Sequence, residues 1–301
     1  MKINLYLNPN PPLNGDVLID RWGRKYFMKN EPFLEVEFIN FPKGEYEVEF
    51  LYPFANLKKI EIKSSRESIY FLDKRFGDPS ISQIKLKLKG KNIEKEFDIG
   101  VKVYKITGKI KRFNKRIFPV YLWAAREKLM KYEIIAKVKE NDTFTIYYPE
   151  GRKLRLFIAD TTYGKSSLET WIYADELKGD IKVNPFVGGN FEFYEIKVWY
   201  HDEMWNVFFI PAIVDSIYPP DLNKEDIKLW INDFSVKIKS FTPHRLYFYS
   251  HEKNKGKYYP AYLLTGIIEK LKDELEYPII IRLFISSNKK NLKGEGWYIC
   301  F

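Results

Sequence analysis

The chain has 301 residues, of which 45% are apolar and 17% aromatic, and its formal net charge is +10 at pH 7. This length is sufficient for two or three domains with hydrophobic cores of their own. The single cysteine, Cys300, excludes an intramolecular disulfide and a cysteine metal cluster. No apolar stretch approaches the roughly 18 residues of a membrane-spanning helix, and Met1–Pro11 contains no apolar signal core. The sequence therefore predicts a cytoplasmic protein with no membrane contact.

The positive charge is spread along the chain. Lys and Arg exceed Asp and Glu by two, four and four in residues 1–101, 102–215 and 216–301. A net charge that is dispersed along the chain mainly favours solubility, whereas nucleic-acid-binding proteins usually have their basic residues clustered on one face. An acid-free basic stretch runs from Lys102 to Arg116, and lysines of this kind keep an exposed edge strand from aggregating. A contact with a phosphate backbone is the alternative. We therefore do not expect a nucleic-acid partner. The scarcity of Gln, Cys and Met beside abundant Lys and Glu indicates a heat-adapted protein.

Residues 1–101 alternate apolar and charged side chains with a period of two, which predicts an antiparallel β-sandwich domain. Leu34–Phe38 and Glu45–Phe50, joined by Asn40–Gly44, predict a hairpin. Such a hairpin would set Glu against Glu, which is unfavourable. We therefore expect Ile84–Lys89, which alternates Lys with apolar residues, on the same sheet. A divalent cation is the alternative neutraliser.

Residues 102–215 form a second predicted domain, whose first half contains five short motifs in a characteristic order. They are Thr107–Ile110, Phe118–Leu122, Ala136–Val138, Asp142–Ile146 and Pro149–Gly151 leading into Leu154–Ile158. From about residue 104 to 160 this order resembles the carboxypeptidase regulatory-like domain, a transthyretin-like β-sandwich, although the family favours Gly where this chain has Thr143. The resemblance implies an accessory domain without catalytic activity. Later stretches, such as Tyr163–Glu169, resemble uncharacterised bacterial proteins that carry this domain.

The segment Ala159–Ser166 follows the apolar run Leu154–Ile158 and ends in Gly-Lys-Ser, as a phosphate-binding loop does. In such a loop Lys165 would contact phosphate and Ser166 would bind Mg²⁺. However, Ala159 replaces the first glycine, which adopts positive φ at no steric cost. The residues after Ser166 also alternate as a strand and not as the helix whose N-terminus would face the phosphates. We favour a loop between two strands and keep the nucleotide site as an alternative.

Phe191–Tyr200 and Trp205–Val214 predict a hairpin closed over His201–Met204. Its predicted core face carries Tyr194, Ile196, Val198, Tyr200, Trp205, Val207 and Phe209, and its other face carries Phe193 and Trp199. Amphipathic rings at a loop edge can stack on sugars, so our candidate binding platform is Trp171, Tyr173 and Trp199. The alternative is that these rings cover a second sheet or a domain interface.

His201, Asp202 and Glu203 are the remaining candidates for a metal or acid–base group. Adjacent residues at a hairpin tip point in different directions, and His244 and His251 lie far away in the sequence. We therefore expect a solvated turn here and predict no metal and no cofactor.

The third predicted domain, residues 216–301, begins after Tyr218-Pro219-Pro220. Leu264, Ile267, Ile268, Leu271 and Leu275 form one apolar stripe between Pro260 and Pro278, which predicts a helix. Strands are expected at 227–231, 234–238, 279–285 and 296–301. The predicted fold class is mostly β, with three antiparallel β-sandwich domains of immunoglobulin-like or transthyretin-like type and one helix near the C-terminus.

We found no coherent catalytic set of residues. The leading functional hypothesis is a non-catalytic binding or structural module, with carbohydrate or another polymer as the first ligand class to test. Two alternatives stay open. One is a nucleotide-dependent enzyme that uses Lys165 and Ser166, and the other is an intracellular scaffold that binds protein partners.

Overall fold

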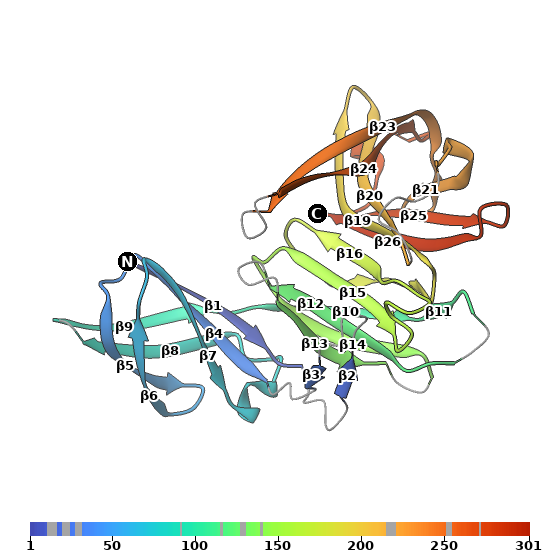
Figure 1. The fold of residues 1–301 in the computed structure, drawn as a ribbon. Coiled ribbons are helices and arrows are strands. Elements are labelled where there is room, and N and C mark those ends of the chain that lie inside the picture. The colour runs from blue at the N-terminus through green and yellow to red at the C-terminus, as the bar shows by residue number, and fades with distance from the viewer. Residues whose placement is uncertain are drawn as a thin grey trace.

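The computed structural model describes residues 1–10, 17–19, 25–27, 32–90, 92–114, 117–126, 131–138, 141–214, 221–250, 255–270 and 272–301 (Figure 1). Strands dominate, which confirms the mostly β prediction. The helical elements of the described residues are three short 3-10 turns, η1 (Lys74–Gly77), η2 (Lys224–Asp226) and η3 (Lys272–Glu274). None of the helices in this part of the chain is long and apolar enough to span a bilayer.

The predicted helix after Pro260 is wrong, because most of this segment is strand β24 (Lys255–Ile267). β24 pairs with β20 (Met204–Ile213) on one side and with β23 (Lys237–Ser250) on the other. Tyr262 and Leu264 point into the core with a period of two. Pairing on both edges satisfies the backbone and buries these side chains, and this outweighs the helical spacing of the leucines and isoleucines.

The N-terminal residues form a β-sandwich beside the rest of the molecule (Figure 1). One sheet has the order β1 (Lys2–Asn8), β4 (Phe33–Ile39) and β7 (Arg66–Leu72). The other has the order β6 (Asn56–Ile62), β5 (Gly44–Tyr52), β8 (Gln83–Gly90) and β9 (Ile93–Gly100). Their inner faces enclose one hydrophobic core, which includes Phe38, Val48 and Leu86. The short strands β2 (Val17–Ile19) and β3 (Lys25–Phe27) pair with each other.

The predicted hairpin of residues 34–50 is wrong, because β4 and β5 belong to opposite sheets of this sandwich. The turn between them therefore crosses from one sheet to the other, and the Glu residues of the two strands do not face each other. The predicted neighbour of β5 is confirmed: Glu47 is opposite Lys89 and Glu49 is opposite Lys87 on β8. Opposite charges across a strand pair stabilise the sheet.

A single eight-stranded sheet forms the centre of the remaining chain. Its order is β13 (Lys131–Lys137), β12 (Val120–Arg126), β15 (Leu154–Asp160), β16 (Thr170–Ala174), β26 (Leu292–Cys300), β25 (Ile279–Ser287), β21 (Ile227–Ile231) and β22 (Phe234–Ser235). β16 and β26 are parallel and join the two halves. The C-terminal strands therefore extend the sheet of residues 120–174, and the predicted boundary at residues 215 and 216 does not separate two independent cores.

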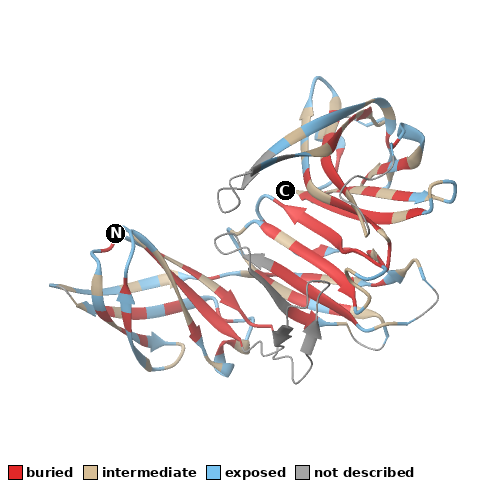
Figure 2. Cartoon of the chain, viewed as in Figure 1, coloured by how far each residue is buried: buried red, intermediate tan, exposed pale blue. Residues whose placement is uncertain are grey.

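Two smaller sheets cover opposite faces of this central sheet, so the arrangement has three layers. On one face lies the sheet β14 (Thr143–Pro149), β10 (Val103–Lys109) and β17 (Ile181–Lys182), with a core that includes Leu122, Ile146 and Leu156. On the other lies the sheet β19 (Phe191–His201), β20, β24 and β23, with a core that includes Phe157, Phe209 and Leu283. Buried residues accordingly line the central strands (Figure 2). The short strands β11 (Lys111–Arg112) and β18 (Phe186–Val187) pair in parallel.

The basic stretch from Lys102 contributes strand β10, which is not an edge strand as predicted. β14 lies on one side of it and β17 on the other. The side chains of Asp180 and Asn184 also accept hydrogen bonds from the backbone N–H groups of Lys105 and Lys109, at 2.8 and 3.0 Å. These contacts, and not the lysines alone, protect the strand from pairing with another chain.

Candidate functional site

The predicted platform of Trp171, Tyr173 and Trp199 is not a surface feature. Trp171 and Tyr173, on β16, are only 2% and 5% exposed, because the sheet β19-β20-β24-β23 covers them. Their rings stack at 5.3 Å with an interplanar angle of 8°, and the Trp171 indole donates a hydrogen bond of 2.6 Å to Glu192. Burial raises the pKa of Tyr173 well above its ordinary value. The alternative interpretation, in which the rings are covered by a second sheet, is correct for Trp171 and Tyr173.

Trp199 lies apart from these two rings, on the exposed half of the β19–β20 hairpin. It is 44% exposed and is opposite Asn206 on β20. On β19 the predicted core face is correct only between the hairpin tip and a bulge that lies between Tyr194 and Lys197. Before the bulge, Phe193 is fully buried. The bulge adds one residue to β19 at Glu195, whose φ is 50°, and this moves the following side chains to the opposite face of the strand.

In the segment Ala159–Ser166, the first two residues end strand β15 and the others form a closed loop that leads to β16. The backbone N–H groups of this loop are occupied. Tyr163 bonds to Asp160, Lys165 and Ser166 bond to the Thr162 carbonyl, and Gly164 bonds to Ser167. The N–H of Thr162 bonds to the buried Asp160 carboxylate at 2.8 Å. A phosphate loop needs these donors free and a helix after them. Lys165 and Ser166 are exposed in a turn that strand β16 follows at Thr170, so this geometry does not form a nucleotide site.

His201, Asp202 and Glu203 form the predicted solvated turn. Asp202 and Glu203 have φ of 48° and 58°, as a two-residue hairpin turn requires, and His201 pairs with Met204. The His201 and Asp202 side chains are 3.1 Å apart but 75% and 74% exposed. Among the described residues, no group of three or more His, Cys, Asp and Glu is arranged to hold a metal ion. His251 lies outside those residues.

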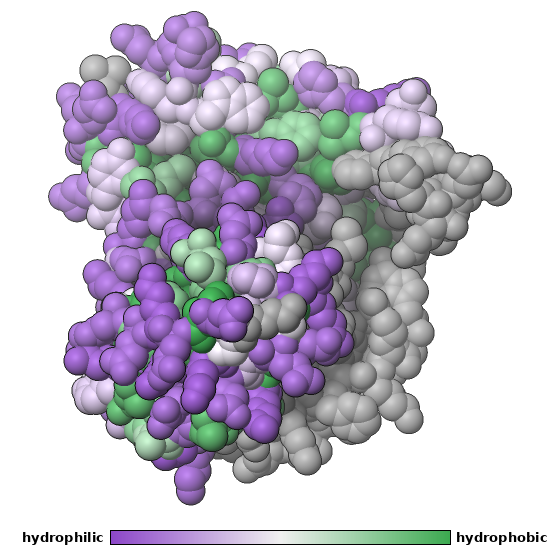
Figure 3. Space-filling view, turned by 90° about the vertical axis from the view of Figure 1, so that its left-hand side faces the viewer, coloured by the Kyte–Doolittle hydropathy of each residue, from purple (hydrophilic) through white to green (hydrophobic). Residues whose placement is uncertain are grey.

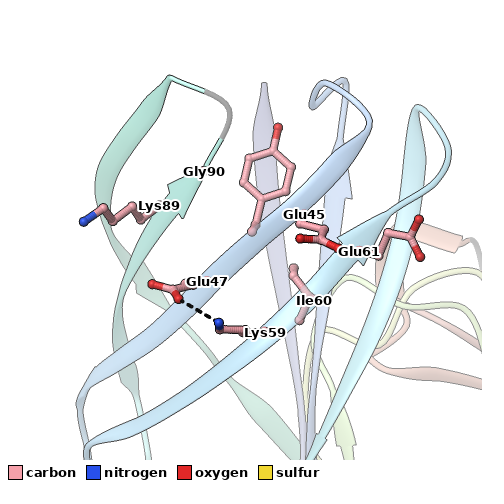
Figure 4. A pocket seen from close by; sticks show the side chains of 8 residues that line it. Glu45, Glu47, Lys59, Ile60, Glu61, Lys89 and Gly90 are labelled. Atoms are coloured by element: carbon pink, nitrogen blue, oxygen red, sulfur yellow. Dashed lines mark ion pairs between the residues drawn. The ribbon is translucent and has the colours of Figure 1, made fainter.

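The outer face of the β6-β5-β8 sheet carries a hollow of about 610 Å³ that is lined mainly by charged residues (Figure 4). Glu45 is opposite Glu61, and Glu47 lies between Lys59 and Lys89. The Lys59–Glu47 ion pair measures 3.6 Å, with the Lys59 side chain largely exposed and the Glu47 side chain about half-exposed. Seen from the left-hand side of Figure 1, hydrophilic residues cover much of the lower part of the described surface (Figure 3). Exposed ion pairs of this kind are worth little free energy and do not define a ligand.

The hairpin of β23 and β24 supplies a better candidate. β24 pairs with β20 only from Tyr262 to Gly266. Among the described residues, the earlier part of β24 pairs with β23 alone, so the two strands project beyond the sheet (Figure 1). We call this projection the arm, which comprises residues 243–250 and 255–261.

One face of the arm continues the buried face of its sheet. At the base, Phe241 and Tyr262 stack in the core with ring centroids 4.7 Å apart. Side chains alternate along a strand, so the same face continues outward in register. The residues on this continuation, here called the arm face, are Pro243, Arg245, Tyr247, Tyr258 and Pro260. Tyr247 and Tyr258 are 56% and 57% exposed, and their ring centroids lie 5.0 Å apart with an interplanar angle of 52°.

Two hollows adjoin the arm face. The first, of about 600 Å³, is lined by Asp221, by residues 243–245 of β23 and by residues 258–262 of β24. The second, of about 550 Å³, is lined by residues 221–225, Lys239, Phe241, Pro243 and Tyr262. Both hollows touch Asp221, Pro243 and Tyr262, so they form one continuous depression along β23. The depression combines exposed rings with carboxylate, imidazole and guanidinium groups, which are the components of a polar ligand site.

Sequence reasoning missed this site because it assigned residues 260–275 to a helix. The signal was nevertheless present in the spacing of Tyr247, Tyr249, Tyr258 and Tyr262 around the segment 250–255. Residues with a high strand preference on both sides of a short polar segment predict a hairpin. The assignment depended on whether Leu264 belonged to a period of two or a period of 3.6.

A second cluster of aromatic rings surrounds Arg282 on β25. The guanidinium lies 5.0 Å from the Trp230 ring centroid and 5.3 Å from that of Phe284. Its Nε donates a hydrogen bond to Glu295, which is fully buried and also accepts one of 2.6 Å from the Phe186 N–H. Burial raises the pKa of Glu295. Because the charge of Arg282 is compensated inside the protein by Glu295, this cluster is a weaker ligand candidate.

Comparisons with known proteins identify no family. No family model matches the chain, and no curated protein matches it. Among solved structures, a DUF3823 family protein from Parabacteroides merdae is 14% identical, with 66% of this chain and 98% of that chain covered and a TM-score of 0.21. The major pilin subunit BcpA of Bacillus cereus is 9% identical, with 66% and 69% covered and a TM-score of 0.19. Scores this low carry no argument, so the β-sandwich assignment rests on the sheets and cores described above.

Proposed function

We propose that this protein is a non-catalytic β-sandwich module that binds carbohydrate on the arm face. The observation that carries the proposal is the exposed pair of Tyr247 and Tyr258 beside a polar depression. The carboxypeptidase regulatory-like resemblance of residues 104–160 belongs to the same proposal, since it implies an accessory domain that assists a binding or anchoring role.

Tyrosine rings suit a sugar ligand for a physical reason. One side of a pyranose ring presents C–H groups, and an exposed phenol ring can cover that side while its hydroxyl stays in water. Asp221, His244 and Arg245 line the neighbouring hollow and offer acceptors and donors for the sugar hydroxyls. A few polar groups next to a flat apolar surface give orientation as well as affinity.

The arm holds the two tyrosines in place before a ligand arrives. A Cβ at Gly256 would lie 1.8 Å from the Tyr247 hydroxyl, so the Tyr247 side chain lies over this glycine. Tyr258 is directly opposite Tyr247 in the strand register. Rings that are already ordered lose little conformational entropy on binding, which favours affinity.

A polysaccharide pull-down and a glycan array test the proposal, with Tyr258→Ala as the main variant. Tyr258 is exposed, so its removal is expected to leave the fold intact while binding falls about tenfold, as one lost stacking contact predicts. Trp199→Ala is the matched control, because Trp199 is also an exposed aromatic residue but lies on another hairpin. The absence of any glycan ligand, or equal losses in the two variants, would refute the proposal.

A further inference from the structure

The two strands of the arm carry charge of one sign. β23 and β24 together contain Lys237, Lys239, Arg245, Lys255 and Lys257 and have no Asp or Glu. Residues 102–116 are likewise free of Asp and Glu. On the β5-β8-β9 sheet, by contrast, cations lie beside carboxylates, and Lys87 pairs with Glu94 at 2.7 Å. The 14 residues of β23 and the 13 residues of β24 thus carry only positive formal charge, which favours a positive potential beside these strands even in a chain whose total charge is dispersed.

Arg245 is the cation that lies on the arm face itself. In the register it is opposite Pro260, one row inward from the Tyr247–Tyr258 pair. Rows on one face of a strand are about 7 Å apart. A sugar stacked on the tyrosines therefore brings the next sugar of the chain to Arg245. Among the described residues, the ion pairs do not include Arg245, and its side chain is exposed.

The acidic residues near the depression do not cancel this charge. Asp221 and Glu225 line it together with Lys224, Lys239 and Arg245, and His244 adds a group that gains charge at low pH. Another nearby carboxylate, that of Asp226, is paired with Lys290 at 2.5 Å. The charged side chains that line the depression, His244 aside, are thus three cations and two carboxylates.

We propose that the carbohydrate bound by the arm is an acidic polysaccharide, with a uronate ring on the Tyr247–Tyr258 pair and a uronate carboxylate on Arg245. This inference rests on the proposed function and names its ligand class. A guanidinium matches a carboxylate through two parallel N–H···O hydrogen bonds, which gives direction as well as charge. A neutral sugar chain would use the rings but would leave Arg245 without a partner.

The experiment compares polygalacturonate with its methyl ester, since esterification removes the charge and keeps the sugar. Isothermal titration is performed with the full chain and with Arg245→Gln, Arg245→Lys, Tyr258→Ala and Lys165→Gln. We expect the wild-type protein to bind polygalacturonate at least tenfold more tightly than the ester, because a charge-assisted hydrogen bond is stronger than a neutral one. Its affinity for polygalacturonate should fall as the salt concentration rises from 50 to 500 mM, because salt screens the charges. Arg245→Gln should abolish the preference and keep binding of the ester. Arg245→Lys should keep part of the preference, because a lysine supplies charge without the bidentate geometry.

Lys165→Gln is the matched control, because it removes an exposed cation from a loop outside the arm. Equal affinity of wild type for the acid and the ester would overturn this inference and leave the proposed function intact. An equal loss in Lys165→Gln and Arg245→Gln would overturn it as well, since the effect would then be one of net charge. Binding of single-stranded oligothymidylate, but of no glycan, would overturn both proposals in favour of a nucleic-acid ligand. Thermal unfolding of each variant confirms that it is folded.

Discussion

The side chain of Asn10 exchanges two hydrogen bonds with the backbone of Tyr147. Its Nδ2 donates to the Tyr147 carbonyl at 2.8 Å, and its Oδ1 accepts from the Tyr147 N–H at 2.8 Å. Asn10 follows β1 of the N-terminal sandwich, while Tyr147 lies on β14 of the three-layer unit. The Asn10 amide thus pairs with the backbone N–H and C=O of Tyr147 as a neighbouring strand would. It joins the two units without extending either sheet.

Arg152 forms the second link between these units and gives the first prediction. It lies in the turn after β14, forms an ion pair of 2.7 Å with Glu35 on β4, and covers the Tyr6 ring at 3.8 Å. Glu35 is 5% exposed, so Arg152→Ala leaves a buried carboxylate without its partner. We expect a loss of about 3 kcal/mol in unfolding free energy. Calorimetry should show the N-terminal sandwich melting separately. The exposed Lys153→Ala is the control, and a single unshifted transition in Arg152→Ala would contradict the prediction.

Asp160 determines the shape of the loop that resembles a phosphate site. Its carboxylate accepts hydrogen bonds from the Thr162 N–H and hydroxyl and from the Ser167 hydroxyl, at 2.8, 2.5 and 3.1 Å. Asp160→Ala removes the acceptor of these three hydrogen bonds, while the Thr162 and Ser167 hydroxyls still contact each other at 2.8 Å. It should lower the unfolding free energy by about 1 to 3 kcal/mol. Lys165→Ala, at the exposed tip of the same loop, should change it by less than about 0.5 kcal/mol. Urea denaturation measures both, and similar effects in the two variants would disprove this role of Asp160.

Gly108 on β10 has no room for a side chain. A Cβ there would lie 1.8 Å from the Val183 carbonyl oxygen and 2.7 Å from the Phe144 ring. Gly108→Ala should therefore destabilise the fold by about 1 to 3 kcal/mol, because the backbone at Val183, directly after β17, and the Phe144 ring would have to move. The control is Gly100→Ala on β9, where the nearest atom is 3.9 Å away. Thermal melts of the pair should differ by several degrees, and melts that coincide would refute the close approach.

Cys300 on β26 should react slowly with alkylating reagents. Burial raises the pKa of this thiol from 9.0 to about 11, with a smaller contribution from the nearby Asp175. The thiolate is the reactive form, so the iodoacetamide rate should rise through about pH 11 in the folded protein and through pH 9 in urea.

The raised pKa of the Cys300 thiol also makes the unfolding free energy depend on pH. Between pH 9 and 11 the unfolded chain loses the Cys300 proton and the folded chain keeps it, so the unfolding free energy should fall as pH rises. Cys300→Ser removes this part of the slope and serves as the control. Equal alkylation midpoints in the folded and unfolded protein would contradict the prediction.

The sequence determined the local features of this protein that depend on side-chain alternation. The period of two in Glu45–Phe50 and Ile84–Lys89 predicted two strands of opposite charge, and these strands pair. The hairpin over His201–Met204 and the strand-to-strand loop at Ala159–Ser166 were also predicted correctly. Each of these features requires only neighbouring residues or a direct charge match, so the information lies within a short segment.

The tertiary structure decided which face of each strand is covered and which strands are neighbours. Trp171 and Trp199 look alike in sequence, yet one lies between two sheets and the other in solvent, because coverage depends on β19 and β24. Leu264 fits a helical stripe and a strand equally well, and the pairing of β24 with β20 and β23 selected the strand. The arm face exists because β24 extends past its pairing with β20 at Tyr262. Burial and strand pairing are properties of the assembled sheets, so periodicity within one segment does not contain them.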